Sequence, residues 1–249
     1  MNSLNFIRVL VKNILLQTLL LTAFVLPALC NTYSTTNDST LSTKGKLSLN
    51  LQEHLQIFYP LHNSSEYSVT ICADLPDNNN PKCVYKKGEP GHVFLILSKQ
   101  NPVTAEVITK SFGFYPRVPV SCLFKQVRSV IHDNSNREYD ASIEKKLTKE
   151  EFAGMLEKCK ELAKKKYNLN RYNCYDYVLE VFNSLPGIEK LPFTKVKFPF
   201  IFGKGGSPCG LYSDLKKLLV GGSSCAPFIK FGLYKSPASN NSQNLIASF

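Results

Sequence analysis

A cysteine at the predicted start of a helix is the best-placed nucleophile in this chain. Cys174 follows Asn173, a good helix N-cap, and Asp176 has the spacing of the acidic partner in a capping box. Apolar residues then recur at helical spacing until Pro186-Gly187 ends the pattern. Unpaired N–H groups at a helix N-terminus stabilise a thiolate, so this position favours a reactive thiol with a lowered pKa. The alternative is a buried or disulfide-bonded cysteine, and this stretch alone favours neither.

A nucleophilic thiol needs a histidine that takes its proton and returns it to the leaving group. The chain has four histidines. His92 follows a Pro-Gly turn and opens the apolar run 92–97, which is typical of a buried central strand with fixed side-chain directions. The other three lie in weakly patterned sequence or beside a polar loop. His92 is therefore the candidate general base, and the alternative is a surface histidine at a strand end.

Three short motifs together resemble the circularly permuted papain-like group, which includes relatives of NlpC-type cell-wall amidases and of lecithin:retinol acyltransferase. The motifs are Gly91-His92-x-Phe94-Leu95, Gly113-Phe114-Tyr115-Pro116 and Asn173-Cys174-x-Asp176-Tyr177. In that group the histidine precedes the cysteine, as it does here, and the resemblance covers roughly residues 66–219. It implies an antiparallel sheet packed against the helix that carries the cysteine, with Cys174 as nucleophile and His92 as general base.

The group also uses a third polar residue, often on the strand after the histidine. That region offers Glu106, Thr109 and Ser111, of which Ser111 is the candidate we retain. The usual second histidine or clear acid is not obvious here, so the resemblance leaves open whether the site is active. The aromatic stretch 111–116 is predicted to be a loop that either walls a cleft or fills the core. The predicted lining of the cleft is Phe114, Tyr115, Asn173 and Asp176.

The order of the patterned segments predicts an α+β domain. Strands are expected over 66–73, 91–97, 105–109, 120–130 and 137–147, with 83–85 pairing back on the first. A capping box at Thr148 predicts a helix that runs to about Tyr167, and a short helix is expected over 211–220. Because the strands precede the helices, the pattern favours separate sheet and helix layers over alternating βαβ units.

The first thirty residues have the pattern of an export signal. A short basic start precedes the apolar run 14–29, which is too short and too weakly flanked for a membrane span, and the small residues Ala28 and Cys30 allow cleavage near Asn31. The chain is predicted to be secreted or periplasmic, or membrane-anchored if the leader is not cleaved. The expected segments are a signal peptide over 1–30, a flexible tether over 31–46, the papain-like domain over 47–235 and a disordered tail over 236–249.

Export to an oxidising compartment makes the cysteine count informative. Of the eight cysteines, Cys30 falls in the leader, and the remaining odd number leaves at least one thiol unpaired. Spacing around a turn-rich loop and around the 211–220 helix suggests two disulfides, although sequence alone does not fix connectivity. The predicted pairs are Cys72–Cys83 and Cys209–Cys225. Cys122 and Cys159 are then a third pair or buried thiols, and Cys174 is free.

The chain is strongly basic, with a formal net charge of +11 that becomes 11 − 2 = +9 once Arg8 and Lys12 leave with the leader. Such a charge favours anionic surroundings such as a cell wall or lipid head groups. The sequence has no nucleic-acid motif, no CxxC and no HExxH, so we expect no nucleic acid, metal or cofactor, and a monomer.

These observations predict an exported papain-like cysteine hydrolase or acyltransferase. Attack by Cys174 on an amide or ester would give an acyl-enzyme, with a cell-wall peptide or a lipid acyl group as the substrate. The alternative is a secreted, disulfide-stabilised binding module or effector on an inactive papain-like fold.

Overall fold

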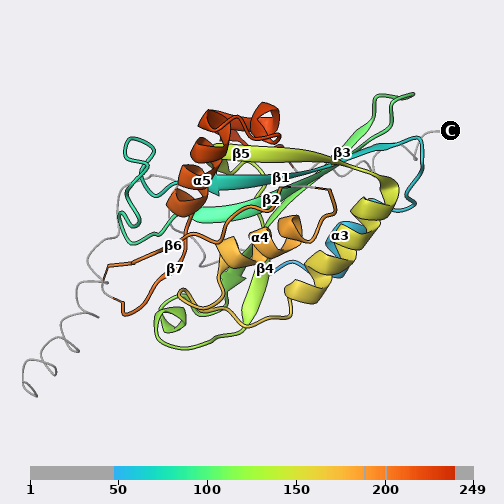
Figure 1. The fold of residues 1–249 in the computed structure, drawn as a ribbon. Helices are drawn as coiled ribbons and strands as arrows, with labels where there is room; N and C mark the ends of the chain where they lie inside the picture. The colour runs from blue at the N-terminus through green and yellow to red at the C-terminus, as the bar shows by residue number, and fades with distance from the viewer. Residues whose placement is uncertain (1–47, 188, 200, 239–249) are drawn as a thin grey trace, which may run out of the picture. The chain divides into compact units, whose positions relative to one another are not determined.

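Alternating apolar residues build a six-stranded antiparallel sheet with the strand order β4-β3-β2-β1-β5-β8 (Figure 1). The computed structural model describes residues 48–187, 189–199 and 201–238. The sheet strands are β1 (Glu66–Asp74), β2 (His92–Gln100), β3 (Val107–Pro116), β4 (Ser129–Asp133), β5 (Glu138–Leu147) and β8 (Ile229–Lys235). The predicted α+β class with an antiparallel sheet is confirmed.

Short helices and one small hairpin complete the described elements. The helices are α2 (Leu51–Gln56), α3 (Lys149–Leu162), α4 (Cys174–Asn183) and α5 (Pro208–Val220), with the 3-10 turns η1 (Ser121–Leu123) and η2 (Ala226–Phe228). The hairpin strands are β6 (Lys195–Val196) and β7 (Gly205–Gly206). Helix α4 packs against β2 and β3, and α3 lies beside α4 (Figure 1).

The main core lies between the helices and one face of the sheet. On β2 the residues Val93, Leu95 and Leu97 belong to this core, together with Phe112 and Phe114 of β3. Since side chains alternate along a strand, the residues between them occupy the other face. The opposite face of β2 carries His92, Phe94 and Ile96, and that of β3 carries Ser111, Gly113 and Tyr115.

The central strands are placed by a continuous register. Asp74 of β1 pairs with His92 of β2, Phe94 of β2 pairs with Gly113 of β3, and Gly113 pairs with His132 of β4. This register gathers the ends of four strands around the start of β2, where His92 lies.

Several predicted elements need correction. The stretch 111–116 is not a loop, because Phe112 and Phe114 alternate with residues on the other face and strand β3 continues to Pro116. The predicted strand 120–130 is replaced by η1 and a loop, and β4 begins only at Ser129. The stretch 83–85 forms no strand.

Helix α3 begins at the predicted capping box but ends at Leu162 rather than near Tyr167. The reason is tertiary, because the Tyr167 backbone exchanges two 2.8 Å hydrogen bonds with Val127 in an isolated bridge. Tyr167 is thereby drawn out of the helix and toward the sheet.

The predicted boundaries of the domain are tested only in part. Ser236, expected to begin a disordered tail, is buried, and its backbone N–H donates to the Arg137 carbonyl over 2.9 Å. The leader over 1–30 and the tether over 31–46 lie outside the described residues, so export stays a prediction. Over the ranges given above, no helix combines the length and apolarity that a bilayer crossing requires.

The capping box of α3 gives a direct test of local stability. The Thr148 hydroxyl accepts from the Glu151 N–H over 3.2 Å, and the Glu151 carboxylate accepts from the Thr148 N–H over 2.9 Å. Thr148→Ala should lower the free energy of unfolding by about 1 kcal/mol, measured by urea denaturation. Ser213→Ala, at an exposed position inside α5, is the control and should change stability by less than about 0.5 kcal/mol. Equal effects of the two changes would contradict the capping role.

Candidate functional site

The first turn of α4 is held in place by the side chain of Asn173. Its Oδ1 accepts from the Tyr175 N–H over 2.8 Å, and Asp176 Oδ2 accepts from the Asn173 N–H over 2.9 Å, so the predicted capping box is confirmed. The Asn173 amide also donates to the carbonyls of Leu169 and Gly206, over 2.8 and 2.9 Å. These bonds fix the position of Cys174, the next residue, relative to the hairpin and to the preceding turn.

The Cys174 thiol lies at the beginning of β2. The Val93 backbone N–H and the Tyr167 hydroxyl act as hydrogen-bond donors toward it. Val93 directly follows His92, so the thiol is placed beside the strand end that carries the candidate base. The side chain is nearly enclosed, with Cys174 only 6% exposed.

Burial decides the acidity of this thiol. Desolvation raises the pKa of Cys174, and the nearby Asp176 carboxylate adds to the increase, whereas donors from Val93 and Tyr167 act in the opposite direction. The prediction of a lowered pKa is therefore wrong. The helix terminus favours the thiolate as expected, but that effect is smaller than the loss of solvation in an enclosed position.

His92 lies on the face of the sheet opposite the main core, where its ring packs against aromatic side chains. Its ring stacks on Tyr115 with centroids 4.2 Å apart and lies nearly parallel to Phe94 at 6.1 Å. His132 meets the same Tyr115 ring edge-on at 5.0 Å. A Cys174 thiolate is close enough to raise the pKa of Tyr115 further, although burial is the main cause of that increase. Tyr115 therefore stacks on the imidazole and is also within the electrostatic reach of a Cys174 thiolate.

Gly113 leaves the space that the imidazole occupies. A Cβ atom at this position would lie 2.2 Å from His92 Nε2 and 2.6 Å from Asn134 Oδ1. The two polar atoms thus flank the same point above the strand. Asn134 is completely buried, and its Oδ1 has no hydrogen-bond partner among the described residues. An acceptor oxygen in this position is suited to orient an imidazole N–H.

Asn134 is the site residue that sequence reasoning missed. Ser111 was the candidate for the third role, and it lies on the same face, two positions before Gly113. Its carbonyl accepts from the Asn134 N–H over 2.9 Å, so Ser111 holds the backbone of Asn134 beside the imidazole. The sequence signal that could have indicated Asn134 was the polar run after His132. That run ends β4, the strand next to β3, and so lies beside Gly113.

A second layer of polar contacts holds Asn134 and Tyr115. Asn134 Nδ2 donates to the Tyr115 hydroxyl over 2.6 Å, and Arg137 donates to the same hydroxyl over 3.3 Å. Arg137 also forms a 2.6 Å ion pair with Asp74. Burial raises the pKa of Asp74 to about 6 even though the Arg137 charge opposes the increase. The Ser236 hydroxyl donates to the Asn134 carbonyl over 2.5 Å.

The four residues predicted to line a cleft have different positions. Phe114 is in the core, stacked on Tyr177 with centroids 4.9 Å apart. Asn173 and Asp176 are buried in the helix cap and are occupied by its hydrogen bonds. Of the four, Tyr115 stacks on His92.

The predicted disulfides are absent from the structure, in which all seven cysteines of the described residues are free thiols. Cys72 is fully buried in the sheet with Phe94 and Ile96, whereas Cys83 is half-buried in a loop. The Cys83 thiol donates to the Tyr85 carbonyl over 3.3 Å. Cys209 lies 3.0 Å from Ser207 Oγ rather than beside Cys225.

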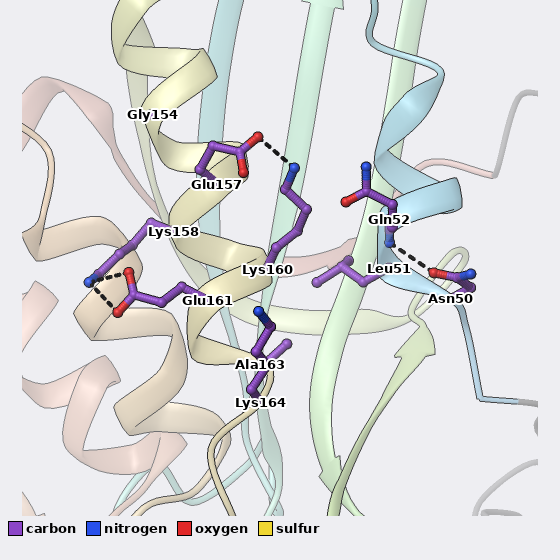
Figure 2. A pocket seen from close by; sticks show the side chains of 10 residues that line it. All are labelled: Asn50, Leu51, Gln52, Gly154, Glu157, Lys158, Lys160, Glu161, Ala163 and Lys164. Carbon is purple, nitrogen blue, oxygen red and sulfur yellow. Dashed lines mark hydrogen bonds and ion pairs between the residues drawn. The ribbon is translucent and has the colours of Figure 1, made fainter.

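A separate surface groove between α2 and α3 contains none of these residues (Figure 2). Its charged side chains form local ion pairs, Lys158 with Glu161 and Lys160 with Glu157, at 2.9 and 2.5 Å (Figure 2). Exposed pairs of this kind are ordinary solvated surface. In the described part of the chain no three His, Cys, Asp or Glu side chains gather as a metal site would require.

Comparisons with protein-family models, with curated proteins and with solved structures gave no match.

The space above Gly113 can be tested by adding one methyl group. Gly113→Ala should lower the free energy of unfolding by roughly 1–3 kcal/mol, because the new Cβ overlaps His92 and Asn134. Gly154→Ala is the matched control, since its Cβ would meet nothing within 4 Å on an exposed face of α3. That change should raise stability by up to about 1 kcal/mol. Urea denaturation of both variants measures the difference, and similar shifts in both would refute the packing described above.

The reactivity of the thiol gives a second test. A thiol whose pKa is raised is protonated at neutral pH, so iodoacetamide should label Cys174 more slowly at pH 7 than the half-buried Cys225. The Cys174 rate should then increase as the pH passes above the ordinary thiol value of about 8.5. Peptide mapping by mass spectrometry follows both sites. Rapid labelling of Cys174 at pH 6 would instead indicate a preformed thiolate.

Proposed function

We propose that this protein is a papain-like cysteine hydrolase or acyltransferase in which Cys174 attacks an amide or ester carbonyl. The observation that supports this most is that three groups lie around the start of β2, the thiol on the helix side of the sheet and the imidazole and Asn134 on the opposite side. The Cys174 thiol faces the N–H of Val93, the His92 imidazole lies over Gly113, and Asn134 Oδ1 flanks the same point.

The proposed roles follow from what each group can donate or accept. His92 is the general base that takes the thiol proton, because a neutral imidazole nitrogen accepts a proton near neutral pH. Asn134 is a positioning residue whose Oδ1 has no hydrogen-bond partner among the described residues and lies where it can accept one imidazole N–H, which leaves the other ring nitrogen for the thiol. Asn134 replaces Ser111 in our assignment of the third role.

The raised thiol pKa specifies how the reaction would begin. The resting pair is a neutral thiol and a neutral imidazole rather than an ion pair, so proton transfer to His92 accompanies attack on the carbonyl. The thiolate sulfur forms a bond to the carbonyl carbon, and the oxygen takes the negative charge. His92 then gives its proton to the leaving amine or alcohol, which leaves a thioester on Cys174. Water or an acceptor alcohol or amine resolves the thioester.

The developing oxyanion needs donors that are already in place. The Cys174 backbone N–H is in the first turn of α4, where intrahelical acceptors are missing. The Tyr167 hydroxyl, a donor toward the thiol, is the second candidate. Because Tyr167 is held by the bridge to Val127, its hydroxyl requires little reorganisation to serve the site.

A binding module on an inactive papain-like frame is the second candidate function. The enclosure of Cys174 and its raised pKa favour this reading, because both make the thiol a weaker nucleophile in the resting state. The two functions differ in whether an acyl group accumulates on Cys174.

An acyl-enzyme experiment separates the two functions. The full chain is incubated with p-nitrophenyl esters, and release of nitrophenol is followed together with the intact mass. An enzyme should show a covalent acyl group on Cys174 and turnover that Cys174→Ala abolishes. His92→Ala should slow turnover by about 10²–10⁴-fold, the usual contribution of a general base. An acyl group that never appears on Cys174 would favour the binding module.

Two further variants serve as controls in the same experiment. Cys225→Ser removes a half-buried thiol outside the site and should leave turnover unchanged. Asn134→Asp keeps an acceptor oxygen and should retain more activity than Asn134→Ala, whose pH–rate profile should also shift as the imidazole loses its orienting partner. Equal losses in both Asn134 variants, with an unshifted profile, would reduce Asn134 to a packing role.

A further inference from the structure

Two loops on one side of the domain expose apolar side chains to solvent. The loop between β3 and β4 presents Val120 and Phe124, which are 71% and 77% exposed. The hairpin loop between β6 and β7 presents Phe202, which is fully exposed. Single exposed apolar residues are ordinary, but large ones gathered on neighbouring loops indicate an interaction site.

The two loops are joined by a small apolar cluster beneath their tips. Leu169, Phe198 and Ile201 are buried together, and Leu123 of the β3–β4 loop packs against them. The Asn170 amide donates to the Phe202 carbonyl over 2.5 Å. Figure 1 shows the β3–β4 loop, in green, on the same side of the domain as the β6–β7 hairpin, in orange. The exposed tips are therefore parts of one surface, which we call the loop surface (residues 117–126, 197–199 and 201–204).

The loop surface adjoins the candidate site. The β3–β4 loop starts directly after Tyr115-Pro116, and the Cys122 carbonyl accepts from the Leu169 N–H over 3.1 Å.

The charges within the two loops and their flanking residues all have one sign. The stretches 116–128 and 195–207 contain no Asp or Glu. Their basic residues, all exposed, are Arg117, Lys125, Arg128, Lys195, Lys197 and Lys204. Such a surface complements a negatively charged partner and repels a second copy of itself.

We propose that the loop surface docks onto an anionic lipid bilayer. Phe124, Val120 and Phe202 enter the boundary between head groups and acyl chains, and the surrounding lysines and arginines remain at the level of the anionic head groups. The apolar tips favour a bilayer over a purely polar anionic polymer, because such a polymer has no apolar region in which these side chains could be removed from water. This docking goes beyond the proposed acyl transfer and does not depend on it.

The chain has no tryptophan, so a single introduced tryptophan reports its own surroundings. Phe124→Trp and Phe202→Trp place the probe in the loop surface of the full chain. Val103→Trp is the matched control, because Val103 is also exposed but lies in the turn after β2, at the opposite end of that strand from His92. All three are made with Cys174→Ala, so that no covalent chemistry contributes.

With phosphatidylcholine–phosphatidylglycerol vesicles, emission from Trp at 124 and 202 should shift to the blue and be quenched by lipids brominated in the acyl chain. Emission at 103 should change in neither respect. Pure phosphatidylcholine vesicles, or high salt, should weaken the shift at 124 and 202 severalfold. Binding through the apolar run 14–29 alone would leave all three probes in water. The probes at 124 and 202 therefore distinguish it from docking by the loop surface.

Four results would overturn the proposal. One is unshifted emission at 124 and 202 while the protein sediments with anionic vesicles. The second is a shift that depends on protein concentration without vesicles, which indicates a second copy as the partner. The third is a shift with cell-wall sacculi but not with vesicles, and the fourth is an equal shift with neutral vesicles. Turnover of soluble p-nitrophenyl esters does not require docking, so failure of either proposal can be recognised without the other.

Discussion

The geometry of the candidate site depends on a missing side chain. Gly113 lies between Phe94 and His132 in the sheet, and its hydrogen in place of a Cβ lets the His92 ring and the Asn134 amide come together over one strand. Protein interiors are close-packed, so even one methyl group would displace both. Tyr115 stacks on the imidazole in this space and is hydrogen-bonded by Arg137, and the Ser236 hydroxyl holds the Asn134 backbone through its carbonyl.

At Cys174 two physical effects oppose each other, and their sizes determine the state of the thiol. A helix N-terminus stabilises a nearby anion by about 0.3–1 kcal/mol, and by about 2 kcal/mol in partly buried geometries. Full desolvation of an ionisable group shifts its pKa by as much as 3–5 units, equivalent to about 4–7 kcal/mol. With Cys174 only 6% exposed, the larger effect prevails and the resting thiol is protonated. A base beside it is therefore more important than the helix dipole.

Local signals predicted the elements that carry the site, and non-local packing determined the rest. The Asn173 cap and the apolar run of β2 depend on neighbours in sequence, and both were predicted. Asn134 could not be assigned without the β3–β4 register, because 42 positions separate it from His92 along the chain. The thiol pKa also required the fold, since burial raises it and the Val93 N–H that opposes the increase comes from a distant strand. The start of strand β3 was predicted, but its second half over 111–116 was missed, because the aromatic residues there are typical of a loop as well as of a core.

The β3–β4 loop connects the surface proposed for docking with the chemistry proposed for Cys174. Its tip carries Phe124, and its end at Val127 forms two backbone hydrogen bonds with Tyr167. The Tyr167 hydroxyl is in turn a donor toward the Cys174 thiol. The exposed tip is thus connected through a short, hydrogen-bonded stretch of backbone to a group that stabilises charge at the nucleophile. Because the thiol is enclosed, a small displacement of this loop changes both its solvation and its donors, and both changes alter its pKa.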